Sequence, residues 1–190
     1  MDNFTQFITG FRQYRQKKLH PIGMVLIKIG MTANILTFIS LLSGVGAAYF
    51  LFTNYILFLV LGLLHLAADS MDGVVASIQG KSTFGHYFDH GTDNFVAVLL
   101  MLKIGYFLQD YYAYLVAGLY LLAQLVYIFS KLTAPVLFGR SVSMITLFFY
   151  IPAVVSMTSY LPLLIYLFLG VIAVYSLARQ LQWMIRTKFS

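Results

Sequence analysis

Four aspartates lie close together in a strongly apolar chain. The chain has six acidic residues among 190, and the segment 69–93 holds four of them, at Asp69, Asp72, Asp89 and Asp93. The first pair is spaced by three residues and the second pair by four, so on helices each pair shares one face. Carboxylate oxygens are the ligands that Mg²⁺, Mn²⁺ and Ca²⁺ prefer. The pattern predicts a site for one divalent cation, or two, with all four aspartates as ligands.

A cation is expected because ionised carboxylates at such a site repel one another. Their burial at a membrane costs several kcal/mol unless positive charge offsets it. Lys81 is the only basic residue between Asp69 and Asp93, so the protein is expected to offer too little compensation of its own. The alternative interpretation, acids that cap helix ends or face solvent, explains one or two of the four.

The composition is that of an integral membrane protein. Hydrophobic residues make up 61% of the chain and charged residues 9%, and the mean hydropathy is +0.85. The absence of cysteine excludes disulfides and thiolate chemistry. Apolar runs of about twenty residues predict an all-α membrane domain over residues 31–190. Its six expected transmembrane helices are 32–52, 55–77, 86–108, 111–130, 141–158 and 161–184.

The basic residues predict the orientation in the membrane. They precede the first span, follow the last span and occupy alternate connections, whereas the connections near 53, 110 and 159 contain none. Positive charge accumulates on the cytoplasmic side, so both termini and the aspartates are expected there. Membrane topology explains most of the net charge of +6 without a nucleic-acid partner.

The segment 1–30 is expected to form a separate amphipathic helix. Its apolar side chains have helical spacing, at Phe4, Phe7, Ile8, Phe11 and Tyr14, and most of its basic residues lie off this stripe. This pattern is typical of a helix in the headgroup plane that contacts anionic lipid. The alternative is a basic flank that only enforces orientation.

The aspartates belong to a longer motif. Asp69-x-x-Asp72-Gly73-x-x-Ala76, followed by Gly85-x-x-x-Asp89-x-x-x-Asp93, resembles the signature of the CDP-alcohol phosphatidyltransferase family. The sequence "MTANILT", with Asn34 and Thr37, resembles the start of that family's first membrane helix. The resemblance implies a six-helix membrane domain with a cytoplasmic amphipathic helix before it, and a homodimer.

The resemblance also implies a reaction. Enzymes of this family transfer a phosphatidyl-type group from a CDP-linked lipid donor to an alcohol and release CMP, with Mg²⁺ or Mn²⁺, here expected as two ions. Asp93 would be the catalytic base and would also be able to touch the second metal. The residues expected to contact the nucleotide are Asn34, Asp69, Gly73, Ala76, Ser77, Lys81 and Gly85.

The chain departs from the family pattern at one position. Ser77 stands where the family usually has an arginine that is associated with the nucleotide's diphosphate, and the gap from there to Gly85 is one residue shorter than usual. Lys81 either replaces that arginine, as a point charge without the guanidinium fork, or faces the cytoplasm.

The acceptor alcohol is expected near a second group of basic residues. Lys131, Arg140 and Arg179 fall at the cytoplasmic ends of spans four to six. Family members that use a phosphorylated acceptor, such as inositol phosphate or glycerol phosphate, resemble this chain there. The alternative is positive-inside anchoring. His65, one helical turn before Asp69, is expected either to hydrogen-bond to it or to be an ordinary polar residue between helices, and His86 and His90 are expected to support the acids of the third span.

Other functions remain open from the sequence. "FDHGTD" also resembles the choline and ethanolamine branch of the family, which transfers a phosphobase from a CDP-alcohol to a lipid alcohol. A divalent-cation transporter would use the acidic cluster as an ion site, but the opposite connections offer only Asp110 as a further acid. A catalytically weakened relative is the third alternative, because Ser77 replaces the usual arginine.

Overall fold

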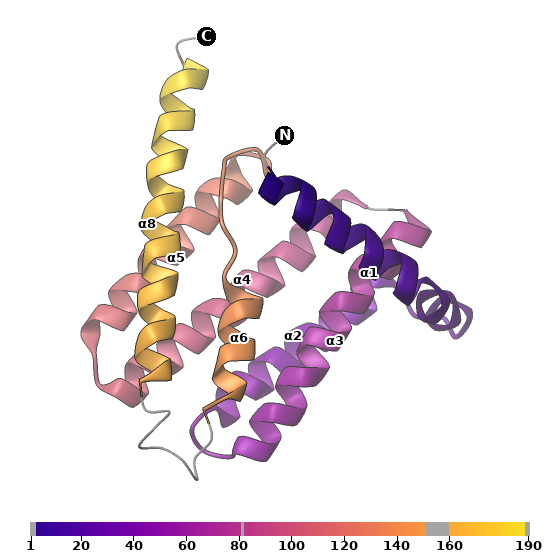
Figure 1. The fold of residues 1–190 in the computed structure, drawn as a ribbon, viewed down its shortest axis with the longest axis horizontal. Coiled ribbons are helices and arrows are strands. Elements are labelled where there is room, and N and C mark those ends of the chain that lie inside the picture. The colour runs from indigo at the N-terminus through magenta and orange to yellow at the C-terminus, as the bar shows by residue number, and fades with distance from the viewer. Residues whose placement is uncertain (1–2, 81, 151–159, 189–190) are drawn as a thin grey trace.

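The computed structural model describes residues 3–80, 82–150 and 160–188. For residues 3–13 and 15 it describes the backbone only. Within these ranges the chain is helical and contains no strand. The helices are α1 (Asn3–Lys28), α2 (Ala33–Phe50), α3 (Tyr55–Gln79), α4 (Thr83–Leu108), α5 (Tyr111–Phe129), α6 (Arg140–Phe148) and α8 (Leu161–Lys188) (Figure 1).

Short polar connections determine where four of these helices begin. In each case the residue before the helix has an extended backbone, and its side-chain oxygen accepts a hydrogen bond from a backbone N–H of the first turn. Such caps satisfy amide groups that would otherwise lack a partner in an apolar environment. The capping residues of α2, α3, α4 and α5 are Thr32, Asn54, Ser82 and Asp110.

Five helices, α2, α3, α4, α5 and α8, are long and apolar enough to cross a membrane. They coincide with five of the six predicted spans to within about four residues, and the protein is an all-helical membrane protein. The remaining predicted span, 141–158, begins as α6, which has nine residues. Residues 151–158 of that span lie outside the described residues.

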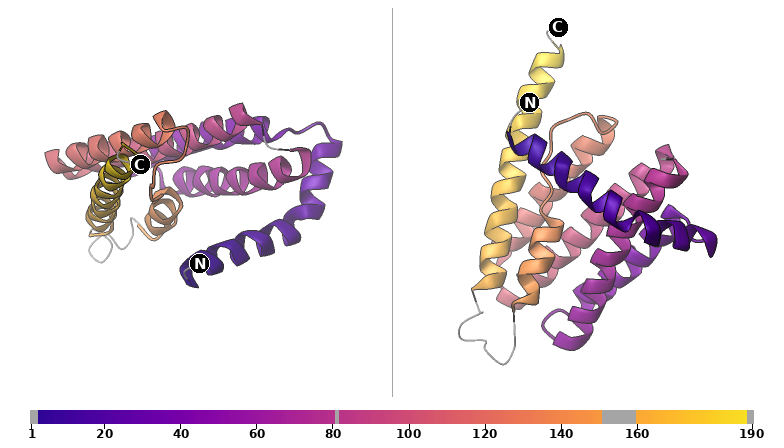
Figure 2. Two further views of the ribbon diagram at one scale, coloured as in Figure 1. Left: turned by 90° about the horizontal axis from the view of Figure 1, so that it is seen from above. Right: turned by 45° about the vertical axis from the view of Figure 1, so that its right-hand side comes forward.

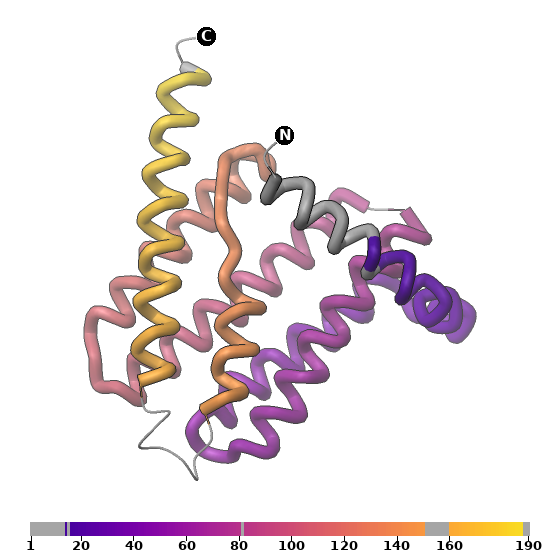
Figure 3. Tube along the Cα trace, in the orientation of Figure 1, coloured from indigo at the N-terminus to yellow at the C-terminus, as the bar shows by residue number. Residues whose placement is uncertain are grey.

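The helices form a bundle in which α4 joins two groups. On one side α4 contacts α2, on which α3 packs, and on the other side it contacts α5 and α8, which pack on each other. The short α6 contacts α3, α4 and α8, and the chain path in Figure 3 shows it between α3 and α8. The largest fully buried apolar side chains of the core include Phe58, Leu100, Met101, Tyr120 and Leu169. This packing brings the beginning of α6 to the sides of α3 and α4.

The helix α1 bends part-way along its length and crosses the end of α3 (Figure 2). It contains Pro21, a residue that commonly kinks helices. Gly23 makes the contact with α3 close, because a Cβ at this position would lie 2.9 Å from Cγ1 of Val74. The side chains of Phe4, Phe7, Ile8 and Phe11, which carry most of the predicted apolar stripe, lie outside the described residues.

Candidate functional site

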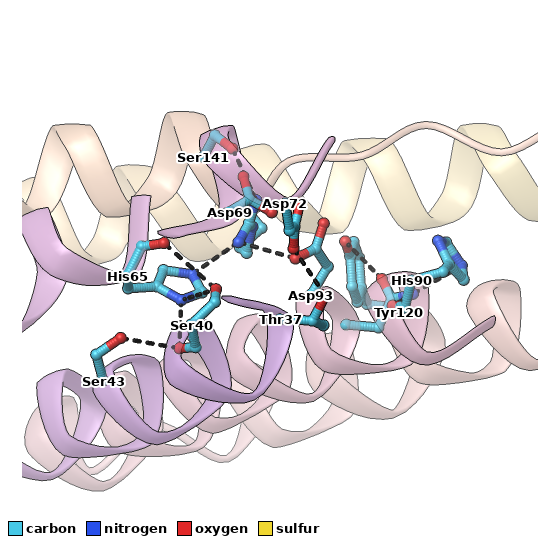
Figure 4. A network of polar contacts seen from close by, with 12 residues as sticks. Thr37, Ser40, Ser43, His65, Asp69, Asp72, His90, Asp93, Tyr120 and Ser141 are labelled. Atoms are coloured by element: carbon cyan, nitrogen blue, oxygen red, sulfur yellow. Dashed lines mark hydrogen bonds and ion pairs between the residues drawn. The ribbon is translucent and has the colours of Figure 1, made fainter. Parts of the chain in front are cut away.

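Three carboxylates from two helices converge in the bundle. Asp69 of α3 and Asp89 and Asp93 of α4 each offer one oxygen within 4.8 Å of the others, and all three side chains are partly buried. The turn of α4 brings Asp89 and Asp93 to one face, and a short connection after Gln79 leads from α3 into α4, both of which pack on α2. In Figure 4 Asp69 and Asp93 point toward one another. Hard oxygen donors in this number fit a divalent cation, so the three aspartates could hold a metal ion.

Asp72, the fourth predicted ligand, is held differently. It is buried, and its Oδ2 accepts a hydrogen bond of 2.9 Å from Oγ1 of Thr37 on α2. It falls outside the group of three convergent carboxylates. Instead it lines a neighbouring pocket together with Asp89. Asp72 therefore lies beside the candidate metal site, with its direction set by a hydroxyl group of another helix.

Arg140 lies between two of the convergent carboxylates. Its Nη2 is 2.6 Å from Oδ2 of Asp69, and its Nη1 is 2.8 Å from Oδ1 of Asp93. Arg140 is only 5% exposed, so these ion pairs are shielded from water. Arg140 thus supplies a positive charge that the sequence spacing did not predict, and it offsets only one of the negative charges. The compensating residue comes from α6, 71 positions after Asp69 in the sequence.

His65 accepts a hydrogen bond from the Arg140 guanidinium and helps to hold it in place. Nε2 of His65 lies 2.7 Å from Nη1 of Arg140, and Nδ1 lies 2.8 Å from the carbonyl oxygen of Ser40. A guanidinium can only donate, so Nε2 accepts and the ring proton is on Nδ1, which donates to the Ser40 carbonyl. His65 is fully buried. Sequence reasoning placed it beside Asp69, whereas the hydrogen bond of its Nε2 is to Arg140.

Gly44 of α2 allows His65 to occupy this position. A Cβ at Gly44 would lie 2.8 Å from Nδ1 of His65 and 2.6 Å from Cγ2 of Val96. We therefore expect Gly44→Ala to displace the imidazole and lower the free energy of unfolding by about 1–3 kcal/mol. Gly118→Ala is the matched control, because nothing lies within 4 Å of the added Cβ. Circular-dichroism melting in detergent measures both variants, and equal melting temperatures would contradict the close packing.

A pocket of about 250 Å³ adjoins the carboxylates between α2, α3 and α4. Four of the predicted nucleotide contacts line it, namely Asn34, Gly73, Ala76 and Gly85, and so do Thr37, Asp72, His86 and Asp89. Gly85 is in close contact with Asn34, since a Cβ there would lie 2.9 Å from Oδ1 of Asn34. Small residues on α3 and α4 thus leave space beside the carboxylates.

The other predicted nucleotide contacts are placed elsewhere. Asp69 is in the carboxylate group and is not part of the pocket lining. Ser77 does not line the pocket either, and its hydroxyl donates to the carbonyl oxygen of Val74 at 2.7 Å. Lys81 lies outside the described residues.

The three predicted acceptor residues do not share a pocket. Arg140 lines a small pocket of about 80 Å³ beside Asp93, whereas Arg179 lines a different pocket of about 160 Å³ with Tyr175. Lys131 is exposed in the turn after α5. The structure thus assigns Arg140 to the carboxylates and leaves Arg179 and Lys131 apart from them.

Two residues that the sequence reasoning missed lie beyond Asp93. Asn94 and Tyr120 line the small pocket together with Asp93 and Arg140. Asn94 is buried, and its Nδ2 lies 2.8 Å from Nε2 of His90. His90 packs edge-on against the ring of Tyr127. A sequence signal existed for Asn94, a polar residue next to Asp93, but Tyr120 is one of 14 tyrosines and has no local signal.

Comparisons with known proteins identify no family for this chain. No model of a protein family matches it. Over 102 residues the chain is 30% identical to an uncharacterized protein of Aquifex aeolicus (strain VF5), a match that covers 53% of this chain and 52% of that protein. The chain thus spans about half the length of the curated relative it matches.

Proposed function

We propose that the protein is an enzyme of the CDP-alcohol phosphatidyltransferase type, which transfers a phosphatidyl-type group from a CDP-linked lipid donor to a small alcohol and releases CMP. One observation carries the proposal. The 250 Å³ pocket is lined by the three small residues of the signature, Gly73, Ala76 and Gly85, and by two of its four aspartates, Asp72 and Asp89. It adjoins the three convergent carboxylates through Asp89, which belongs to both groups. Acidic groups beside a pocket in a membrane protein favour chemistry on a polar ligand over a purely structural role.

The proposed cofactor is Mg²⁺ or Mn²⁺, held by Asp69 and Asp89, with Asp72 and Asp93 beside them. When bound, such an ion neutralises the donor's diphosphate and the charge that develops on the leaving CMP. Asp72 keeps its orientation through the hydrogen bond from Thr37. The space over Gly73, Ala76 and Gly85 would take the cytidine end of the donor.

Asp93 is the proposed general base. It lines the 80 Å³ pocket, whereas Asp89 of the same carboxylate group lines the larger pocket, so we assign the smaller pocket to the acceptor and the larger one to the donor. Its Oδ1 is paired with Arg140, which leaves Oδ2 to take the proton of an acceptor hydroxyl. The hydroxyl oxygen then attacks the donor phosphorus, a new P–O bond forms, and the bond to CMP breaks.

The proposed membrane arrangement has six spans, with α6 as the first part of the fifth. In this arrangement α1 lies in the headgroup plane of the cytoplasmic leaflet, and both termini and the active site face the cytoplasm. The basic residues at alternate connections support this orientation. We also propose a homodimer, which rests on the family resemblance alone.

CMP release from lipid-reconstituted protein tests the proposed function. The donor CDP-diacylglycerol with Mg²⁺ would be offered glycerol 3-phosphate, inositol phosphate, inositol or serine in turn, and CDP-choline would be offered diacylglycerol in a parallel arm. We expect CMP release with one acceptor and its loss with EDTA. Release only in the CDP-choline arm would mean that the donor is a CDP-alcohol and the acceptor is a lipid alcohol. No release in any arm, from protein with native helicity, would contradict the proposal and favour ion transport or a weakened relative.

Ser77→Arg tests the missing arginine. The new guanidinium would stand one residue beyond Ala76, which lines the pocket. From there it would donate hydrogen bonds to the donor's diphosphate, the group with which the family's arginine is associated. We expect donor binding about tenfold tighter, on the scale of one charge-assisted hydrogen bond. Isothermal titration with CDP and Mg²⁺ measures it, with Ser77→Gln as a control for side-chain size. Weaker binding would show that the shorter connection before Gly85 gives this pocket a shape that differs from the family's and does not accept an arginine at position 77.

A further inference from the structure

We propose that Arg140 is a permanent counter-ion of the carboxylate centre and that, as a result, the centre holds one divalent cation rather than two. The inference rests on the metal site of the proposed function, but it does not depend on which reaction the site performs. It makes Arg140 a determinant of metal stoichiometry, in place of the acceptor-binding role that the sequence suggested.

The contacts of Arg140 involve the oxygens that a second ion would need. Two catalytic metal ions lie about 3.5–4 Å apart and share carboxylate ligands. The guanidinium already bridges Asp69 and Asp93 through Oδ2 of the first and Oδ1 of the second. With Oδ2 of Asp93 assigned to the acceptor proton, Asp69 and Asp89 provide ligands for one octahedral ion that keeps several waters.

Arg140 is also held so that it does not leave easily. Its Nη1 donates to Nε2 of His65, which is fixed in turn by the carbonyl of Ser40. Its Nη2 lies 3.3 Å from Oγ of Ser141. Arg140 is only 5% exposed. If its guanidinium moved away, two carboxylates and an imidazole would lose their hydrogen-bond partner, at a large cost in free energy.

The backbone at the start of α6 is equally constrained. A Cβ at Gly139 would lie 2.5 Å from Cδ2 of Leu169, so this segment packs directly on α8. A cation in the first turn of a helix is unfavourable for the helix dipole, and α6 has no acidic residue in its first turn. The carboxylates of α3 and α4 therefore provide the stabilisation that keeps Arg140 in this position.

The charges point to the same stoichiometry. Asp69, Asp89 and Asp93, the three convergent carboxylates, carry three negative charges when ionised, and Arg140 offsets one of them. A single divalent ion then makes the group neutral, whereas two ions would leave it with two positive charges at a partly buried position. Before a donor binds, the single ion is the better-balanced arrangement.

Manganese counting tests the proposal without any measurement of activity. Purified protein in detergent would be titrated with Mn²⁺ and no nucleotide, and free Mn²⁺ followed by its paramagnetic resonance signal. We expect one ion per wild-type chain and two per Arg140→Gln chain. Lys28→Gln, which removes an exposed positive charge at the end of α1, is the control and is expected to bind one.

A second variant guards against misfolding of Arg140→Gln. Arg140→Lys keeps the charge but lacks the fork that reaches both carboxylates, so we expect a second Mn²⁺ to bind here too, more weakly than to Arg140→Gln. Two ions on the wild-type chain would overturn the proposal, as would one ion on a variant with wild-type helicity. One ion on the wild type together with no CMP release would refute the proposed reaction and leave this inference standing.

Discussion

Asp93→Asn is expected to lower the rate of CMP release by about 10²- to 10⁴-fold, the usual contribution of a positioned general base. The amide keeps the shape of the side chain but does not take a proton from the acceptor hydroxyl. The fall should appear in kcat, because the larger pocket is lined by other residues and donor binding should be nearly unchanged. Initial rates at varied donor concentration, in liposomes with Mg²⁺, separate kcat from KM.

Asp110→Asn is the matched control for this substitution. Asp110 caps α5 and accepts a hydrogen bond from the hydroxyl of Tyr166 at 2.7 Å, away from the carboxylate centre. The amide oxygen of asparagine can accept from the backbone N–H of Tyr112, and its amide NH₂ can donate to the Tyr166 hydroxyl, so the rate of this variant should stay at the wild-type level. If Asp93→Asn turns over at a rate within about threefold of the wild type, Asp93 is not the base.

Arg140→Gln is expected to reduce the stability of the metal-free protein by about 3–5 kcal/mol. Removal of one partner of a buried ion pair leaves the other charge uncompensated, and here two carboxylates lose their partner at once. The melting temperature in EDTA should fall by roughly 10 °C. Mg²⁺ should recover much of this loss, because a divalent ion can bind the carboxylates that Arg140 leaves. Circular dichroism in detergent, with and without Mg²⁺, measures both effects.

The exposed Lys28 provides the comparison for Arg140. Lys28→Gln changes the net charge by the same amount, and its melting temperature should match that of the wild type in EDTA and in Mg²⁺. If Arg140→Gln melts at the wild-type temperature in EDTA, the guanidinium is not the counter-ion of Asp69 and Asp93.

The transmembrane helices could be predicted because their signals are local. Runs of apolar residues between Thr32, Asn54 and Asp110 mark the spans, and the same polar residues cap the helices. The convergence of Asp69 with Asp89 and Asp93 also followed from local spacing, since one short connection joins the end of α3 to the start of α4 and both helices pack on α2.

The environment of the aspartates could not be predicted in the same way. The partner of Asp69 and Asp93 is Arg140, which stands 71 residues after Asp69 and reaches it only through the packing of α6 on α3 and α4. From sequence spacing alone, Arg140 cannot be distinguished from the other basic residues near helix ends. The same reason applies to Thr37, which binds Asp72 from another helix, and to the contact of His65 with Arg140.

Metal-dependent binding of CDP is the most direct test of the central claim, that the pocket beside the carboxylates takes the cytidine diphosphate end of a donor. Isothermal titration of the purified protein with CDP would be run in Mg²⁺ and in EDTA, with ADP as the competing nucleotide. We predict binding of CDP in Mg²⁺, its loss in EDTA and with Asp72→Asn, its retention with Asp93→Asn, and weaker binding of ADP. A wild-type protein that binds Mg²⁺ but shows no binding of CDP would contradict the claim.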